Sequence, residues 1–181
     1  MIVPLPPNVR SIGGFVMRCL IVILSCLWSQ AVLALGFAVH DLTPLAEDAR
    51  TTLGKEATVQ AEPFQLLLTC PGCDGAPTIA LQLGRLTDGT EGRIRSGKTT
   101  MGALETMCVK KNPDCRLTTL PAGPGVAWIT SYAFETGAGA TAIVLRDGDL
   151  LTIDARSIDR GAAEDAVLRL SQKLLPRIVG R

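Results

Sequence analysis

The amino-acid sequence predicts an α+β fold: a single domain in which helices pack on an antiparallel β-sheet, as two layers or as an α/β/α sandwich. Three observations predict this class. Several segments alternate apolar and polar residues, as antiparallel strands with one buried face do. Other segments repeat apolar residues every three or four positions and carry capping residues at their ends. In the C-terminal half, three strands follow one another through short turns, which indicates a meander rather than βαβ units.

The first helix is predicted to begin at Thr43, a capping hydroxyl that is followed by proline at the first helical position. We expect it to end at Gly54, because glycine often terminates helices. A strand is expected over residues 64–69, and the prolines and glycines of residues 70–77 predict a turn after it. One face of the helix carries the apolar side chains of Leu45, Ala49 and Leu53.

Another half-buried strand is predicted to begin at Thr78, where apolar and smaller residues alternate. Asp88-Gly89 predicts a turn, and the alternation of Arg93, Ile94 and Arg95 predicts a strand that returns from it. A second helix follows, capped by Thr99 or Thr100 and ended by the Asn-Pro-Asp sequence at residues 112–114. Its apolar side carries Met101, Leu104 and Cys108.

The C-terminal third contains the predicted meander. Asp147-Gly148 lies between two apolar runs, the strongest short-range signal for a β-hairpin. In the strand before these runs, bulky residues alternate with small ones, and we expect Trp128 and Tyr132 to pack in the core. The three strands are predicted at residues 126–134, 141–146 and 149–154.

The last helix is predicted to open at Ser157 or Asp159. We expect Pro176 to end or kink it. Its buried face is predicted to carry Ala163, Val167, Leu170 and Leu174, and its exposed face Glu164, Asp165, Arg169 and Lys173.

Residues 1–34 are predicted to be a signal peptide. Arg10 and Arg18 precede an apolar run at residues 19–28, and small residues at 32–34 resemble a cleavage site. The remaining residues, 35–181, then form the single domain, in a periplasmic or other extracytoplasmic compartment. Met17 followed by Arg18 is an alternative start of the same signal. The alternative to cleavage is a membrane anchor over residues 19–39.

The cysteines of the domain are expected to form two disulfides. Cys19 and Cys26 lie in the predicted leader, and an even number in an exported domain favours disulfides over metal thiolates. Three pairings are possible for four cysteines, of which the local pairs are the most natural. These four residues are Cys70, Cys73, Cys108 and Cys115.

The Cys-Pro-Gly-Cys sequence of Cys70 and Cys73 also permits a redox hypothesis. Such a pair exchanges disulfides when a helix N-terminus lowers the pKa of its first thiol. Asp74-Gly75-Ala76-Pro77 does not begin a helix, so a structural turn is the preferred interpretation. Zinc binding by the four thiols is disfavoured by the wide spacing from Cys108 to Cys115.

Residues 92–99, GRIRSGKT, match the phosphate-binding P-loop pattern. A P-loop follows a buried parallel strand, whereas residues 86–91 are polar and contain a turn, so a nucleotide-binding enzyme is the third hypothesis. Arg93, Arg95 and Lys98 are a candidate site for a small anion. The alternative is a solvated surface with scattered ion pairs.

Composition and charge exclude several other functions. A net charge of +1 does not suggest nucleic-acid binding, and aromatic residues make up 4% of the chain. His40 is the only histidine, so a Ser–His–Asp triad is not expected. The sequence therefore predicts an exported, non-catalytic domain with no metal or cofactor, which binds an envelope protein or a small anionic ligand. Membrane attachment is expected only if the leader remains uncleaved.

Overall fold

The computed structural model describes residues 36–180. The chain separates into two units, residues 1–33 and 34–181, and all of the described residues belong to the second. The predicted leader at residues 1–34, including Met17, therefore lies outside the described residues. Over residues 36–180, no helix is long and apolar enough to cross a membrane.

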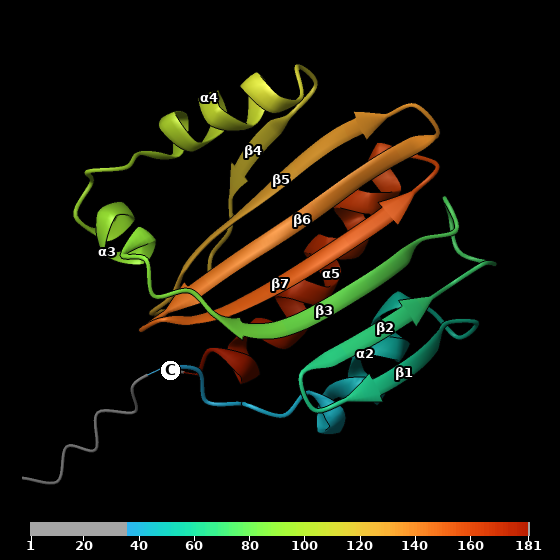
Figure 1. Ribbon diagram of the computed structural model, residues 1–181. Coiled ribbons are helices and arrows are strands. Elements are labelled where there is room, and N and C mark those ends of the chain that lie inside the picture. Colours follow the sequence, from blue (N-terminus) through green and yellow to red (C-terminus); the bar gives the residue numbers. More distant parts are fainter. Residues whose placement is uncertain (1–35, 181) are drawn as a thin grey trace, which may run out of the picture. The chain divides into compact units, whose positions relative to one another are not determined.

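A seven-stranded sheet forms the centre of the described domain, in the strand order β1-β2-β3-β7-β6-β5-β4 (Figure 1). All neighbouring strands pair antiparallel, and β5, β6 and β7 form the predicted meander. The α+β class is therefore confirmed. The strands are β1 (Thr58–Glu62), β2 (Gln65–Thr69), β3 (Thr78–Arg85), β4 (Arg116–Thr119), β5 (Val126–Phe134), β6 (Gly137–Arg146) and β7 (Asp149–Ser157).

The helices lie between and after these strands. The described ones are η1 (Thr43–Leu45), α2 (Ala46–Leu53), α3 (Thr90–Arg95), α4 (Met101–Lys111) and α5 (Arg160–Ile178). Two predicted caps are confirmed, because the side chains of Thr100 and Asp159 accept hydrogen bonds from the first turns of α4 and α5. Helix α5 continues to Ile178, so the expectation that Pro176 ends it is wrong.

The predicted hairpin between β6 and β7 is present. Asp147 and Gly148 have φ angles of 52° and 86°, the two positive values that a type I′ turn requires. Both strands are longer than predicted, since β6 begins at Gly137 and β7 reaches Ser157. The added segment of β6 consists of glycine and alanine, which have low intrinsic strand propensity and acquire their conformation from pairing with β5 and β7.

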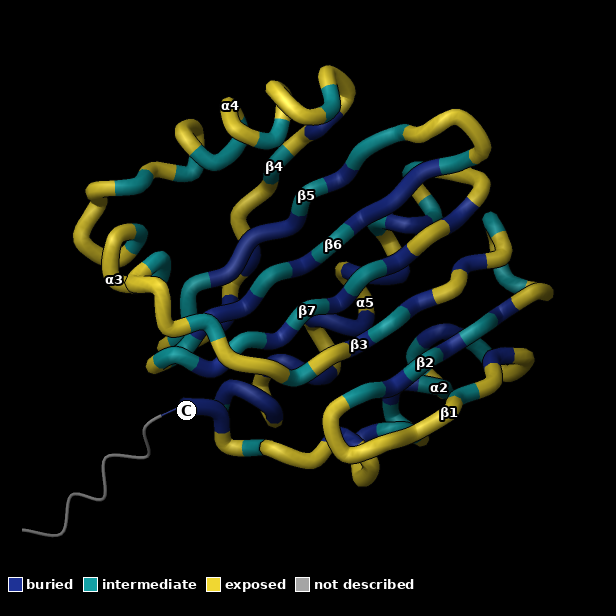
Figure 2. The backbone as a smooth tube through the Cα atoms, viewed as in Figure 1, coloured by how far each residue is buried: buried dark blue, intermediate teal, exposed yellow. Residues whose placement is uncertain are grey.

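Helices α2 and α5 cover one face of the sheet and enclose the core. The predicted apolar face of each helix is buried. Under α5 the sheet presents small side chains, among them Ala127, Ala140, Ala142 and Ala155, which allow the helix to approach closely. Figure 2 shows the buried segments along β5, β6 and β7, whereas β1 and α4 are mostly exposed.

The bulky residues of β5 lie on the opposite face. Trp128 is buried as predicted but does not belong to the core cluster that contains its neighbours Ala127 and Ile129. Tyr132 is only half-buried, and its ring lies over Gly139 of β6, where a Cβ atom would come within 2.7 Å of it. The expectation that Tyr132 packs in the core is therefore wrong.

Two segments differ from what the sequence predicts. Residues 93–95, expected to form a returning strand, lie in helix α3. Strand β1 was not predicted, because its sequence Thr-Val-Gln-Ala-Glu has little apolar content and its residues are mostly exposed at the edge of the sheet. Both segments contact little of the core, so their sequences lack the apolar periodicity of buried strands and helices.

Candidate functional site

Both predicted local disulfides are present. Cys70 pairs with Cys73, and Cys108 pairs with Cys115, with Cα–Cα distances of 5.3 and 5.8 Å. The second bridge joins the last turns of α4 to the start of β4. Helix α4 has no buried residue, and this bridge attaches it to the sheet together with hydrogen bonds from the Leu117 N–H to the Glu105 carboxylate (3.3 Å) and from the Asn112 side chain to the Ala133 carbonyl (2.8 Å).

The Cys70–Cys73 bridge lies against the C-terminal end of α2. Cys70 is fully buried, and Cys73 lines an open cavity of about 310 Å³ beside Arg169. The Cys73 Sγ atom is 3.7 Å from the Leu53 carbonyl oxygen, the negative end of the α2 dipole. A helix C-terminus disfavours a thiolate, in contrast to the N-terminus found in thiol oxidoreductases.

The segment that matches the P-loop pattern does not form a phosphate cradle. Its first residues, Gly92 to Arg95, belong to α3 instead of forming a loop after a buried strand. Lys98 is exposed, and Gly97, with a φ of +73°, makes the turn that leads on toward α4.

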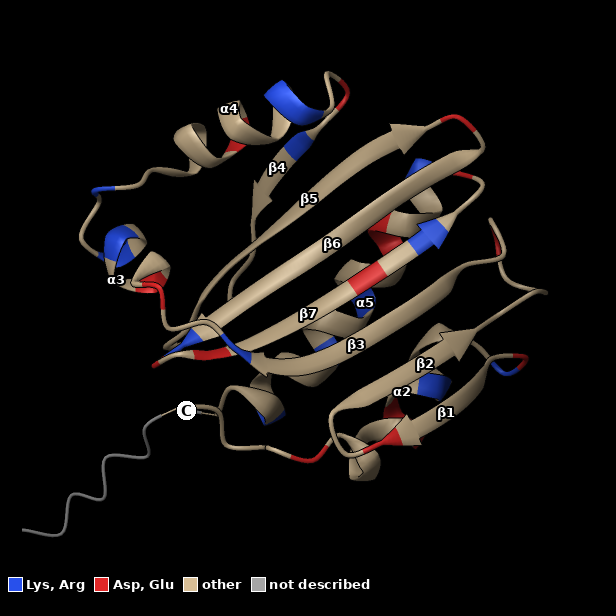
Figure 3. Cartoon of the chain, in the orientation of Figure 1, with Lys and Arg blue, Asp and Glu red and all other residues tan. Residues whose placement is uncertain are grey.

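The three basic residues of the candidate anion site are not brought together around a common point. Arg93 donates hydrogen bonds to the Asp88 carbonyl and the Thr90 hydroxyl (2.9 and 2.7 Å). Arg95 forms an ion pair with Glu91 (2.7 Å) on the preceding turn of α3. In Figure 3, basic and acidic segments adjoin one another along α3 and the loop before it rather than forming one basic face.

A buried carboxylate that the sequence analysis did not single out fastens the start of the described chain to the β6–β7 hairpin. Asp149 accepts hydrogen bonds from the Phe37 N–H (2.8 Å) and from Arg85 (3.1 Å). His40 Nδ1 lies 3.9 Å from the same carboxylate, and all four residues line a cavity of about 180 Å³. No serine, threonine or cysteine lines this cavity, so it lacks the nucleophile of a hydrolytic triad.

On the face of the sheet that α2 and α5 cover, one part without a described helix lies beside α5. Seven strands about 4.8 Å apart make a sheet roughly 29 Å wide. A helix with its side chains is about 10 Å across, so such a face has room for about three helices. On this face α2 covers β1 and β2, and α5 covers β6 and β7 and also contacts β5 (Figure 1). Within residues 36–180, no third helix covers the β4 side.

Burial along β4 agrees with this arrangement. Arg116 and Thr118 point to the same face as α5 and are exposed, whereas Leu117 points to the other face and is half-buried. Helix α4 lies in front of β4 in Figure 1, and α5 lies behind the sheet. The two helices therefore leave the α5 side of β4 open.

Two cavities follow one another along this side of α5. The first, of about 310 Å³, lies between Thr118 and the N-terminal half of α5, where Leu168 is 39% exposed. The second, of about 520 Å³, lies between residues 121–124 and the C-terminal half of α5. We call these two cavities together the α5 groove. From α5 it is lined by Gly161, Glu164, Asp165, Leu168, Ser171, Gln172, Leu175, Pro176 and Arg177.

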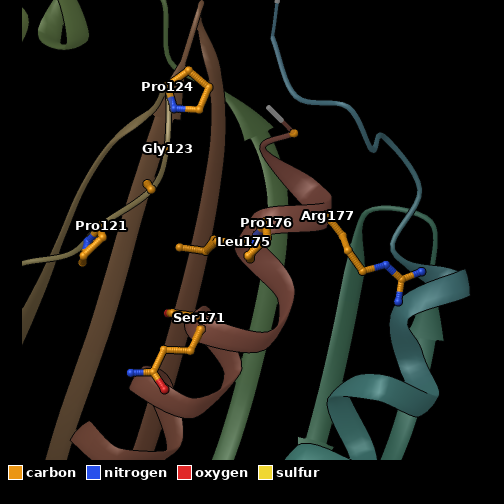
Figure 4. A pocket seen from close by; sticks show the side chains of 10 residues that line it. Pro121, Gly123, Pro124, Ser171, Leu175, Pro176 and Arg177 are labelled. Carbon is orange, nitrogen blue, oxygen red and sulfur yellow. The ribbon is translucent and has the colours of Figure 1, made fainter.

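The groove is mainly apolar and carries two polar groups without partners. The half-buried carboxylate of Glu164 has no hydrogen bond or ion pair with any residue between 36 and 180. The hydroxyl of Ser171 is buried and also lacks a partner among the described residues. Figure 4 shows Ser171, Leu175 and Pro176 on α5, facing Pro121, Gly123 and Pro124 across the second cavity.

No metal centre is evident in the described part of the chain, because no three His, Cys, Asp or Glu side chains converge there. The shifted pKa values lie outside the groove. The pKa of Asp88 is lowered by hydrogen bonds from the Thr90 hydroxyl and N–H, which form an exposed turn before α3. These features provide no acid–base or metal chemistry at the groove.

Sequence reasoning missed the α5 groove, although one signal was available. Leu168 is an apolar residue outside the predicted buried stripe of the last helix, and Ser171 is a polar residue that is fully buried. The opposite wall comes from residues 118–124, and only the sheet topology brings them beside α5. Comparison of the chain with protein families, curated proteins and solved structures gives no significant match.

Proposed function

We propose that this domain is a non-catalytic binding module of the cell envelope, whose α5 groove receives an amphipathic helix of a partner protein. The observation that carries the proposal is the strip of sheet beside α5 that no helix among residues 36–180 covers, with two cavities along it. Its floor is formed by Ile129 and Ser131 of β5, and its rim includes the exposed Leu168.

The length of the groove supports a helical partner. Helix α5 has 19 residues and is therefore about 28 Å long. The two cavities together follow it from Gly161 to Pro176. An amphipathic helix of similar length inserts apolar side chains at every third or fourth position, which suits two successive cavities on one line.

Charge favours a basic residue at one end of the partner helix. The Glu164 carboxylate is half-buried in the first cavity and has no cation among the described residues. An unpaired carboxylate is stabilised when a lysine or arginine of a partner reaches it. A small anionic ligand has less support, since the guanidinium groups of Arg93 and Arg95 already bond to neighbouring groups.

Export is part of the same proposal. Disulfides persist in oxidising compartments, and the described domain holds two of them. The leader at residues 1–34 would deliver the domain, either by cleavage or as an anchor. The redox and nucleotide hypotheses are not adopted, because the end of α2 beside Cys73 disfavours a thiolate and residues 92–95 form a helix.

Site-specific photo-crosslinking in intact cells tests the proposal. A photoreactive phenylalanine analogue replaces Leu168 in the groove or, as control, Met107 on α4, an exposed apolar residue (51%) outside it. We expect one discrete adduct with a single protein from position 168 and none from position 107. Identical diffuse adducts from both positions would contradict the proposal.

A charge reversal tests the electrostatic part. Glu164→Lys is expected to lower the yield of the adduct roughly tenfold, because a like charge then faces the basic residue of the partner. Glu135→Lys, in the exposed turn between β5 and β6, is the matched control and should leave the yield unchanged. Equal yields in both variants would show that no cation of the partner meets Glu164.

A further inference from the structure

The second cavity of the α5 groove has the character of an anchor pocket. Its volume of about 520 Å³ falls within the range of 300–1,000 Å³ that is usual for ligand pockets. One wall is the loop at residues 121–124, and the other is the C-terminal half of α5 (Figure 4). Interfaces concentrate their binding energy in a few side chains that fill such pockets.

The walls suit a flat aromatic ring. Pro121 and Pro124 face Leu175 and Pro176 across the cavity, and none of these side chains carries a polar group. Rigid pyrrolidine rings and a leucine present smooth apolar surfaces with little side-chain entropy to lose on binding.

Two hydrogen-bond acceptors lie on the α5 wall of this pocket. Pro176 lies inside the helix and has no N–H, so it cannot donate to the carbonyl of Gln172, four residues earlier. The Ser171 hydroxyl is buried, has no partner among residues 36–180 and belongs to a residue that lines this pocket. The Gln172 carbonyl only accepts, and the Ser171 hydroxyl both accepts and donates, so a neutral ligand group with a donor can bond to either.

Charged ligands fit this pocket less well. Arg177 also lines it, but its guanidinium is paired with Asp48 of α2. No carboxylate lines the pocket to receive an ammonium group. The polar atom of the ligand is therefore a neutral donor.

We infer that this pocket receives an aromatic side chain that ends in a hydrogen-bond donor, a tyrosine or tryptophan of the partner helix. The inference rests on the proposed function and names the anchor residue of the same groove. The ring fills the space between the two proline-bearing walls. Its O–H or N–H donates to the Ser171 hydroxyl or to the Gln172 carbonyl.

Small probes test the pocket without the partner. p-Cresol and indole are the side chains of tyrosine and tryptophan, and toluene is that of phenylalanine. Each is titrated into the purified, isotopically labelled protein while amide resonances are followed. We expect shifts in residues 121–125 and 171–177, with p-cresol binding about fivefold more tightly than toluene because of one additional hydrogen bond.

Three variants separate the hydrogen bond from the shape of the pocket. Ser171→Ala should remove most of the preference for p-cresol while toluene binds as before, and the matched control Ser96→Ala, an exposed serine, should change nothing. Pro176→Ala restores an N–H for the Gln172 carbonyl and should also weaken the preference. Equal affinity of toluene and p-cresol for the wild type, or shifts only outside the pocket, would overturn the inference. Crosslinking from position 168 would then still decide the proposed function separately.

Discussion

The two sides of α5 differ although they belong to one helix. On the α2 side, Arg177 pairs with Asp48, and Arg169 donates hydrogen bonds to the Thr52 and Leu53 carbonyls (3.2 and 3.5 Å). On the β4 side, no described helix covers the sheet. The domain therefore closes one side of α5 with its own residues and leaves the other as an apolar groove. This difference is what the proposed binding function rests on.

The same contrast appears in the carboxylates of the two sides. Asp48 lies on the α2 side and has an arginine partner from α5. Glu164, on the β4 side, is half-buried and has none among residues 36–180. Glu164 is therefore the carboxylate that the proposed partner would meet with a basic side chain.

The largest expected effect is a difference in the free energy of unfolding between a substitution on the core face of α5 and one on its groove face. Leu174 is fully buried, and Leu174→Ala should lower the free energy of unfolding by about 2–5 kcal/mol, because it leaves a cavity in the core. Leu168→Ala should cost below about 1 kcal/mol, since Leu168 is 39% exposed. Urea unfolding followed by circular dichroism measures both. A large loss of stability in Leu168→Ala would mean that the groove belongs to the core.

The next effect concerns the Cys70–Cys73 disulfide, which lies beside the C-terminal end of α2. Replacement of Cys70 and Cys73 by serine together should lower the free energy of unfolding by about 2 kcal/mol, as expected for a short closed loop. The exported protein, from which residues 1–34 have been cleaved, should show no free thiols when it is denatured without reductant. If glutathione instead readily reduces the Cys70–Cys73 bridge in the folded protein, the redox hypothesis gains support. The bridge would then not be a permanent link beside α2.

The sequence predicted the fold well where burial shapes it. The buried stripe of α5, the caps at Thr100 and Asp159 and the Asp147-Gly148 hairpin all leave local patterns, and all are confirmed. Strand β1 and helix α3 were missed, because they are mostly exposed and their conformation depends on pairing and on the turn at Asp88.

The candidate site was not predictable in the same way. Thr118, Pro121 and Leu168 come from segments up to fifty residues apart, and only the position of β4 at the edge of the sheet places them together. The motifs found in the sequence were the closely spaced cysteine pairs and the P-loop pattern, and each involves only a few consecutive residues. The spacing of the cysteines predicted the disulfides correctly, but the pattern at residues 92–99 gave no information about which residues surround it.

A smaller effect is expected from the ion pair that joins α5 to α2. Arg177→Ala should lower the free energy of unfolding by less than about 1 kcal/mol at low salt, because both partners are partly exposed. The difference between variant and wild type should shrink further as salt is added. A loss of several kcal/mol that does not depend on salt would show that this contact, and not the apolar packing, holds α2 on α5.

The smallest effect is a titration on the exposed surface of α2. Hydrogen bonding by Arg50, three residues away, lowers the pKa of Glu47 below its usual range. A carboxyl with a lowered folded-state pKa contributes stability above its unfolded pKa, and this contribution is lost as the pH falls through the folded value. Arg50→Gln should return the Glu47 midpoint to the usual range, which carbon-detected NMR titration of the carboxyl would show. An unchanged midpoint would mean that Arg50 does not form a stable hydrogen bond with Glu47 in solution. The exposed surface of α2 would then have fewer stable side-chain contacts than the structure shows.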